Sequence, residues 1–211
     1  SFSIVALEHS NICEIPTELA AKLISTYPLL QQQFFNNGEF MMENRPVRVA
    51  QIGVGYWGPN LLRNLVANNK CEVIQIADFS QERREFVASL YPAIMVTNEP
   101  KEILNNGDID AVVIATPVAT HFDFAMHCLE AGKHVLVEKP MATTVDEVHQ
   151  IGRLAEQKNL VAMVGHTFLY NTAVRYVKSL IDNGELGDIR YIYSERVNLG
   201  RIRNDVDALW N

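Results

Sequence analysis

Three glycines with the spacing G-x-G-x-x-G lie between a short apolar run and a stretch of helical periodicity: Gly53, Gly55 and Gly58. In this spacing the first glycine permits a tight turn, the second lets the backbone approach a pyrophosphate, and the third allows a helix to pack closely on a strand. A helix that begins near Trp57 directs unpaired N–H groups and its positive dipole end at the phosphates. The turn, including Tyr56 and Trp57, is therefore predicted to bind a dinucleotide; an unliganded βαβ turn is the alternative.

Asp78 follows the next apolar run, about 20 residues beyond the last glycine of the motif. A carboxylate at that place accepts hydrogen bonds from the adenosine ribose hydroxyls and repels a 2′-phosphate. The sequence thus favours NAD over NADP. Arg83 and Arg84 leave NADP open as the second choice, but we interpret them as part of a solvated helix face.

Two more groups of polar residues directly follow predicted strands: Thr116 and Pro117, then Glu138, Lys139 and Pro140. Open α/β folds bind their ligands at the carboxyl ends of the strands. The first pair fits an ordinary strand-ending turn equally well, and the alternative for Lys139 is a surface lysine. Pro140 has no backbone N–H and stiffens its turn, and we predict a cis bond between Lys139 and Pro140.

Six strands separated by helices are needed to bring these residues to one sheet edge. Short apolar runs alternate with amphipathic stretches, which is typical of βαβ units and a parallel sheet. The strands are predicted at 47–52, 72–77, 93–96, 111–115, 134–137 and 160–164. The helix caps are predicted at Ser80, Thr120 and Thr144, the last with Glu147 in a capping box. The predicted fold class is α/β, a Rossmann doubly wound parallel sheet.

Three segments differ in character along the chain. Residues 1–41 lack the alternating pattern and are predicted to be an N-terminal appendage, whereas 42–165 form the dinucleotide-binding Rossmann domain. Residues 166–211 are predicted to begin a second α/β (α+β) substrate domain, with a helix at 172–183 and a half-exposed strand at 189–197.

The composition is that of an ordinary globular protein, with 211 residues, 48% of them hydrophobic, and a net charge of −7. No basic run favours nucleic acid, and no apolar stretch reaches the roughly 20 residues of a membrane span. The three cysteines are widely spaced, without a metal-ligand or C-x-x-C arrangement, so no metal site is predicted. These features favour a reducing, cytoplasmic setting without membrane or nucleic-acid partners.

Four segments together resemble the glucose-fructose oxidoreductase, inositol dehydrogenase and MocA family: G-V-G-Y-W-G, A-T-P-V-A-T-H, A-G-K-H-V-L-V-E-K-P and G-E-L-G-D-I. The resemblance covers about residues 42–211, and E-K-P is its most specific element. It implies a Rossmann domain followed by a second α/β domain whose open sheet faces the nicotinamide. It also implies that the substrates are sugars or their derivatives and that the full-length protein is a homo-oligomer.

The resemblance also assigns roles at the sheet edge. Lys139 is implied to lie beside the substrate and the nicotinamide as the catalytic residue, Glu138 to contact the nicotinamide ribose region, and His121 to lie near the cofactor. A structural hydrogen bond is an equal alternative for His121. When hydride leaves a sugar carbon, the attached oxygen loses a proton, and an ammonium beside that oxygen stabilises the developing charge or exchanges the proton.

Residues at the exit from the Rossmann unit are predicted by the same resemblance to border the substrate: His166, Tyr170 and Asn171. A core or hinge role fits each of them equally. The run at 195–206 resembles the branch that acts on nucleotide-linked amino sugars, so Arg196, with its neighbouring arginines, is predicted to meet phosphate or carboxylate. The alternative is that these arginines only solubilise an exposed strand.

The sequence predicts an NAD-dependent oxidoreductase that transfers a hydride between the nicotinamide and a sugar or nucleotide-sugar substrate. The resemblance implies that a second catalytic group, a histidine with a neighbouring aspartate, lies beyond residue 211. The alternatives are a non-catalytic NAD(H)-binding module and a fragment that binds cofactor without turnover.

Overall fold

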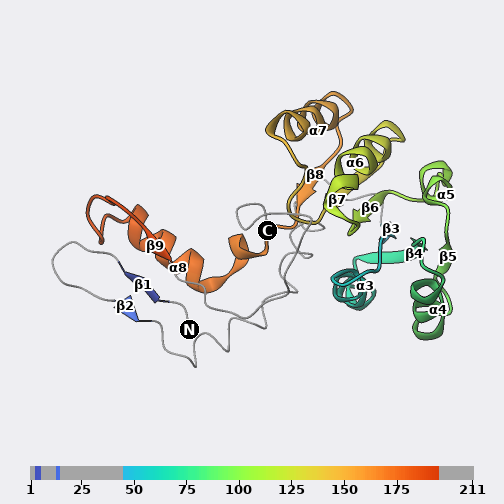
Figure 1. Ribbon diagram of the computed structural model, residues 1–211, viewed down its shortest axis with the longest axis horizontal. Helices are drawn as coiled ribbons and strands as arrows, with labels where there is room; N and C mark the ends of the chain where they lie inside the picture. The colour runs from blue at the N-terminus through green and yellow to red at the C-terminus, as the bar shows by residue number, and fades with distance from the viewer. Residues whose placement is uncertain (1–2, 6–12, 15–44, 195–211) are drawn as a thin grey trace. The chain divides into compact units, whose positions relative to one another are not determined.

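The computed structural model describes residues 3–5, 13–14 and 45–194 (Figure 1). Contacts divide these residues into two units, one formed by residues 45–166 and one by the two N-terminal strands with residues 167–194. Most of the predicted appendage and the arginine-rich run with Arg196 lie outside the described residues. Each unit is described by itself.

The larger unit is built on a six-stranded parallel sheet in the order β5-β4-β3-β6-β7-β8. Its strands are β3 (Val47–Ile52), β4 (Cys71–Ala77), β5 (Met95–Thr97), β6 (Ala111–Ile114), β7 (His134–Val137) and β8 (Ala162–Val164). In chain order this is the arrangement 3-2-1-4-5-6 of a doubly wound Rossmann fold. The predicted fold class is confirmed. The strand order reverses between β3 and β6, so the carboxyl ends of these two strands form the crevice in which such folds bind ligands.

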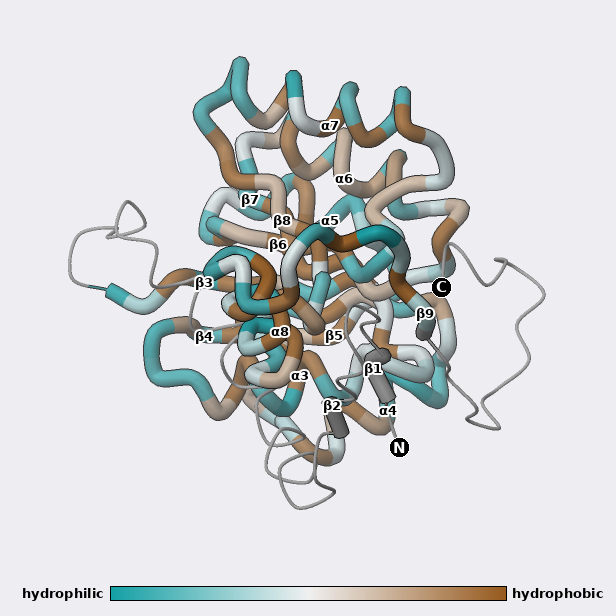
Figure 2. Tube along the Cα trace, turned by 90° about the vertical axis from the view of Figure 1, so that its left-hand side faces the viewer, coloured by the Kyte–Doolittle hydropathy of each residue, from teal (hydrophilic) through white to brown (hydrophobic). Residues whose placement is uncertain are grey.

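Helices cover both faces of this sheet. They are α3 (Gly58–Ala67), α4 (Gln81–Leu90), α5 (Pro100–Asn105), α6 (His121–Glu130) and α7 (Val145–Gln157). Leu62 and Leu65 of α3 pack on one face with alternate residues of the strands, and Leu129 of α6 and Ile151 of α7 pack on the other. All four residues of β6 are buried, as expected for a central strand covered on both faces. In Figure 2 the hydrophilic residues of α7 lie on the side away from α6.

Two of the three predicted helix caps are confirmed. The Ser80 hydroxyl accepts a hydrogen bond from the Arg83 backbone N–H at 3.3 Å, and Thr144 and Glu147 form a reciprocal capping box. The prediction that the Thr120 hydroxyl caps a helix is wrong, although Thr120 does occupy the N-cap position of α6. Its hydroxyl makes no cap bond to α6 and instead lies 2.7 Å from both the Thr116 hydroxyl and the Pro117 carbonyl oxygen.

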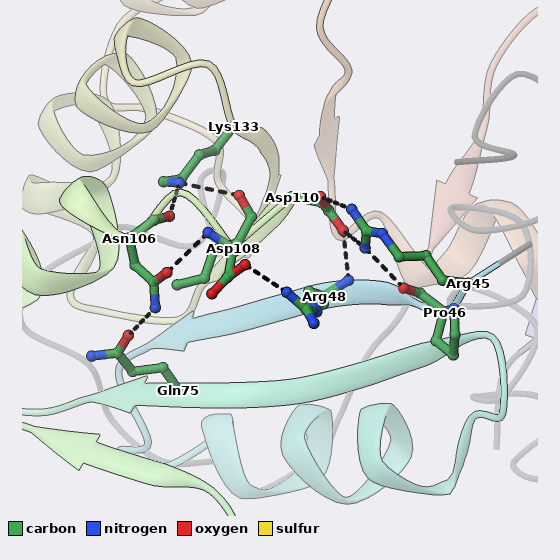
Figure 3. Close-up of polar contacts among 9 residues, drawn as sticks. Arg45, Pro46, Arg48, Gln75, Asn106, Asp108, Asp110 and Lys133 are labelled. Atoms are coloured by element: carbon green, nitrogen blue, oxygen red, sulfur yellow. Dashed lines mark hydrogen bonds and ion pairs between the residues drawn. The ribbon is translucent and has the colours of Figure 1, made fainter. Parts of the chain in front are cut away.

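The amino-terminal edge of the sheet is tied together by a carboxylate (Figure 3). Asp110 accepts two hydrogen bonds from the Arg45 guanidinium, at 2.7 and 2.9 Å, and a third from the Arg48 backbone N–H at 2.8 Å. Burial raises the pKa of Asp110, but the hydrogen bonds from Arg45 and Arg48 outweigh it and the net pKa is lowered. Its charge therefore serves to hold the start of β3 beside β6.

Lys133, just before β7, is also structural. It is only 3% exposed, and its ammonium donates to the backbone carbonyls of Asn106 at 2.6 Å and Ile109 at 3.1 Å (Figure 3). Burial lowers its pKa. These charges lie at the edge opposite the glycine turn and fasten the loop before β6.

The smaller unit contains a short 3-10 turn (Thr167–Tyr170), α8 (Thr172–Asp182) and a three-stranded antiparallel sheet. In that sheet β1 (Ser3–Val5) pairs with β2 (Cys13–Glu14) and with β9 (Tyr193–Ser194). The predicted helix at 172–183 is confirmed to within one residue. The prediction of a strand at 189–197 is wrong for 189–192, which are not in a strand, and 195–197 lie outside the described residues. No helix in the described part of the chain has the length and apolar character needed to cross a membrane.

Candidate cofactor site

The glycine turn joins β3 to α3 at the point where the strand order reverses. Gly53 has a φ of +91°, and a Cβ there would lie 2.6 Å from the Ala115 carbonyl oxygen. At Gly58 a Cβ would lie 2.6 Å from the Gly53 carbonyl oxygen. At Gly55, by contrast, a Cβ would meet no atom within 4 Å. Gly53 and Gly58 must therefore be glycines, because a side chain at either position would clash with a backbone carbonyl oxygen. Gly55, the middle glycine, faces open space.

Gln51 holds the turn in shape from inside β3. Its side chain is fully buried, and its Nε2 donates to the carbonyl oxygens of Gly53 at 2.8 Å and Gly58 at 3.0 Å. One amide group therefore ties together both ends of the turn. The sequence analysis did not single out this residue, because a glutamine within an apolar strand has no local pattern that marks it.

Asp78 lies at the carboxyl end of β4 and reaches the glycine turn. One carboxylate oxygen accepts the Val54 backbone N–H at 2.7 Å, and the other accepts the Ser80 backbone N–H at 2.8 Å. Each carboxylate oxygen has two lone pairs, so the group retains the capacity to accept further hydrogen bonds. The prediction that Asp78 stands beside the turn is consistent with this geometry.

Arg84 does not belong to a solvated helix face, so that part of our interpretation is wrong. Its guanidinium Nη1 donates to the carbonyl oxygens of Asp78 at 2.8 Å and Phe79 at 2.9 Å. The side chain folds back over the end of β4 to reach these two carbonyls. Arg84 therefore stabilises the loop that carries Asp78.

The amino end of α3 is open toward the turn. Trp57 occupies the N-cap position without a side-chain cap bond, and the first turn contains no acidic residue. Tyr56 is 76% and Trp57 38% exposed. The positive dipole end of α3 thus lies next to the space above Gly55, and a helix start of this kind attracts a phosphate. The residues of this edge fit a dinucleotide.

Glu138 links the turn after β7 to the glycine turn. Its carboxylate accepts hydrogen bonds from the Lys139 backbone N–H at 3.2 Å and from the Trp57 side chain. It also packs against Gly165, where an added Cβ would lie 3.1 Å from its Oε1. Burial raises the pKa of Glu138. The Lys139–Pro140 peptide bond is cis, as predicted.

The raised pKa of Glu138 has a defined effect on stability. Its contribution to the free energy of unfolding is fully present below the ordinary pKa of 4.5 and is lost as the pH rises through the folded-state value. Glu138→Gln cannot titrate, so we expect the variant to gain stability relative to wild type as the pH rises from 4 toward neutral. Urea unfolding, followed by Trp57 fluorescence in a Trp210→Phe background, measures the difference.

Glu147→Gln is the matched control with the opposite sign. Hydrogen bonds, first from the Thr143 side chain, lower the pKa of Glu147. Its contribution is present above pH 4.5 and is lost as the pH falls, so this variant loses stability relative to wild type as the pH rises to about 4.5 and shows no further change above it. Parallel pH profiles for the two variants would contradict both assignments.

His121 lies between the turns that follow β6 and β7. Its ring is 1% exposed, with Nδ1 2.8 Å from the Pro140 carbonyl oxygen and Nε2 2.9 Å from the Thr116 carbonyl oxygen. Thr116 also lies close to the first glycine, since a Cβ on Gly53 would lie 3.0 Å from its Cγ2. The fold therefore brings Thr116, His121 and Pro140 to the same edge as the glycine turn. The contacts of the ring are those of the structural alternative, and a role of His121 near the cofactor stays a prediction.

The three residues predicted to border the substrate have other contacts. His166 is exposed at the end of the larger unit, with its backbone N–H donating to the Val164 carbonyl at 2.8 Å. In the smaller unit, Tyr170 lies under the Arg175 guanidinium, 5.3 Å from the ring centre, and the Asn171 side chain caps α8. A role of any of them at the substrate stays a prediction.

Known proteins with the same features were found by sequence and by structure. The model of the GFO/IDH/MocA oxidoreductase family, described as having an NAD-binding Rossmann fold, matches residues 47–166. The uncharacterized oxidoreductase YdgJ of Escherichia coli K12 is 33% identical over 164 residues, which cover 78% of this chain and 46% of YdgJ. The scyllo-inositol 2-dehydrogenase (NADP(+)) IolW of Bacillus subtilis is 32% identical over 166 residues, covering 77% of this chain and 46% of IolW.

Among solved structures, the 3-ketoreductase KijD10 of Actinomadura kijaniata, in complex with NADP and TDP-benzene, superposes with a TM-score of 0.62. It is 28% identical, and the match covers 66% of this chain and 43% of KijD10. This chain therefore spans less than half the length of these three proteins.

Proposed function

The chain belongs to the GFO/IDH/MocA oxidoreductase family, and we propose that it is the cofactor-binding part of an NAD-dependent enzyme acting on a sugar or nucleotide sugar. The observation that carries the proposal is the contrast within the glycine turn. Gly53 and Gly58 are closed against the protein's own backbone, whereas the space over Gly55 is open and lies at an uncapped helix start.

In this proposal different residues of the sheet edge bind different parts of the cofactor. The backbone at Gly55 and the first turn of α3 hold the pyrophosphate, with Tyr56 and Trp57 beside it. Asp78 accepts hydrogen bonds from the adenosine ribose, while Thr116, Pro117 and Glu138 border the nicotinamide half. Lys139 lies at the reacting end. IolW and KijD10 are named with NADP, so the preference of this chain for NAD rests on the charge of Asp78.

A bound nicotinamide would supply hydride transfer to or from a substrate carbon. The protein itself must then transfer a proton to or from the oxygen attached to that carbon. Lys139 is the second residue after β7, at the carboxyl end of the sheet, where open α/β folds bind their ligands. When the substrate is reduced, the Lys139 ammonium stabilises the negative charge that develops on the substrate oxygen and donates a proton to it; when the substrate is oxidised, the neutral amine accepts that proton.

The substrate class is proposed from the relatives rather than from this chain's own contacts. IolW is named for an inositol, and KijD10 is a ketoreductase crystallised with a TDP derivative. We propose a polyhydroxylated substrate of that kind, bordered by His166, Tyr170, Asn171 and Arg196. We also propose that the full-length protein is a homo-oligomer, as the family resemblance implies. The free, buried Cys71 and Cys128 support the proposal that it is cytoplasmic.

The cofactor preference is tested by replacing the carboxylate that would repel a 2′-phosphate. We expect wild type to bind NAD at least about tenfold more tightly than NADP, which corresponds to about 1.4 kcal/mol. In Asp78→Ser that ratio should fall toward one, because the repulsion is removed and the ribose hydroxyls lose their acceptor. Calorimetric titration with both cofactors gives the ratio directly.

Asp108→Ser is the control, because Asp108 carries the same charge at the opposite edge of the sheet, where it pairs with Arg48 at 2.7 Å. Its ratio should equal that of wild type. Tighter binding of NADP than NAD by wild type, with no change in Asp78→Ser, would overturn the assignment of Asp78.

A further inference from the structure

The side-chain amide of Gln51 faces the glycine turn with its nitrogen. Nε2 lies 2.8 Å from the Gly53 carbonyl oxygen and 3.0 Å from the Gly58 carbonyl oxygen, and the side chain is fully buried. Both partners are carbonyl oxygens, which can only accept a hydrogen bond, so the NH₂ end of the amide must face them. The Oε1 end is also buried, and it has no hydrogen-bond partner within the described part of the chain.

This unpaired acceptor indicates that an amide is not the most stabilising side chain for this position of β3. A buried acceptor without a partner costs free energy, and an apolar side chain of the same length would avoid that cost. The neighbours of Gln51 in the strand, Ala50 and Ile52, are apolar and buried. What the amide adds at this position is the pair of hydrogen bonds to the turn.

From this geometry we propose that Gln51 is a positioning residue that holds the glycine turn in the shape that receives the cofactor pyrophosphate. The inference rests on the proposed function. The peptide unit that joins Gly53 to Val54 is held on both sides, because its oxygen accepts from Gln51 and its N–H donates to Asp78 at 2.7 Å. A peptide unit is planar, so these two bonds fix its orientation.

The other end of the turn is fixed by the same amide. Gly58 is the first residue of α3, and its carbonyl oxygen is the second acceptor of the Gln51 nitrogen. The segment 54–57, with Gly55 at its open position, therefore runs between two anchored carbonyls. A turn that is held in this way before the cofactor arrives loses less conformational freedom on binding. Because its side chain is fully buried, Gln51 acts on the pyrophosphate through the backbone.

The positioning role is tested in the full-length protein with Gln51→Met, which keeps an unbranched side chain of similar length and removes the donor. We expect the Kd for NADH, measured by calorimetric titration, to rise at least about tenfold. In steady-state kinetics the KM for NAD should rise by a similar factor while kcat changes less than about threefold, because Gln51 shapes the cofactor site and lies away from the reacting end.

Gln75→Met is the matched control, because Gln75 is a buried glutamine of the neighbouring strand β4. Its amide bonds to the side chains of Asn106 at 3.2 Å and Glu102 at 3.5 Å, away from the glycine turn (Figure 3). We expect similar losses of thermal stability in the two variants and a wild-type Kd for NADH in Gln75→Met. An equal Kd in both variants would overturn the positioning role, whereas absence of NADH binding by wild type would overturn the proposed function and this inference with it.

A measurement on wild type tests the two hydrogen bonds without any variant. The side-chain NH₂ signals of Gln51 are assigned by NMR from its own backbone signals, and their exchange with deuterated water is followed. We expect exchange at least about 100-fold slower than in a free glutamine side chain, because both protons are buried and bonded. Exchange at the rate of a free side chain would overturn the proposal. This result depends neither on NAD binding nor on the folding of Gln51→Met.

Discussion

Replacing Gly55 with valine should leave the stability of the chain unchanged and weaken the binding of NAD by at least about tenfold. The structure offers room for the side chain, since a Cβ at this position meets no atom within 4 Å, and the backbone there does not have a positive φ. The added methyl groups would fill the space that the proposal gives to the pyrophosphate. Thermal unfolding measures the first effect, and calorimetric titration with NAD measures the second.

Gly53→Ala is the matched comparison, because it affects the same turn in the opposite way. Its φ of +91° and the 2.6 Å approach of a Cβ to the Ala115 carbonyl oxygen force the backbone to move. We expect a loss of about 1–3 kcal/mol in the free energy of unfolding. Equal destabilisation by the two substitutions would mean that the space over Gly55 is needed for folding. Undiminished NAD affinity in Gly55→Val would mean that the pyrophosphate lies elsewhere.

The second large effect is expected at Lys139. In the full-length protein, Lys139→Met removes the ammonium and keeps an unbranched side chain of similar length. If Lys139 stabilises and exchanges the proton of the substrate oxygen, kcat should fall by about 10²–10⁴-fold while the affinity for NAD stays near that of wild type. Release of reduced nicotinamide, measured with a panel of cyclitols, sugars and nucleotide sugars, gives kcat for each substrate.

Lys101→Met, on the exposed surface of α5, controls for the loss of a positive charge and should retain wild-type turnover. Full activity of Lys139→Met would remove this residue from the mechanism. Binding of NAD by wild type, without turnover of any substrate in the panel, would instead favour a non-catalytic NAD-binding module.

The sequence predicted the elements of the larger unit because their signals are local. The glycine spacing, the apolar run of β6 and the capping box of Thr144 and Glu147 each involve residues a few positions apart. The parallel sheet then followed from the alternation of strands and helices, since parallel strands require crossover connections. For the same reason the sheet edge that gathers Gly53, Asp78, Thr116 and Glu138 was predictable.

The side-chain network of that edge was not predictable, because its partners are distant in sequence. Gln51 bonds to Gly58, and the ring of His121 meets Pro140, 19 residues further along the chain. Thr120 has the residue type of a helix cap, yet its hydroxyl lies against the Thr116 hydroxyl and the Pro117 carbonyl. Arg84 resembles a surface residue in sequence, and only the fold shows the two carbonyls that it covers.

Binding of NAD by the glycine turn is the central claim, and one calorimetric experiment tests it most directly. Wild type and Gly55→Val are titrated with NADH under the same conditions, after their thermal unfolding curves have been shown to coincide. The account predicts one site per wild-type chain, with a Kd below about 1 mM, and binding at least about tenfold weaker in the variant. Absence of binding to wild type, or equal binding to both proteins, would contradict it.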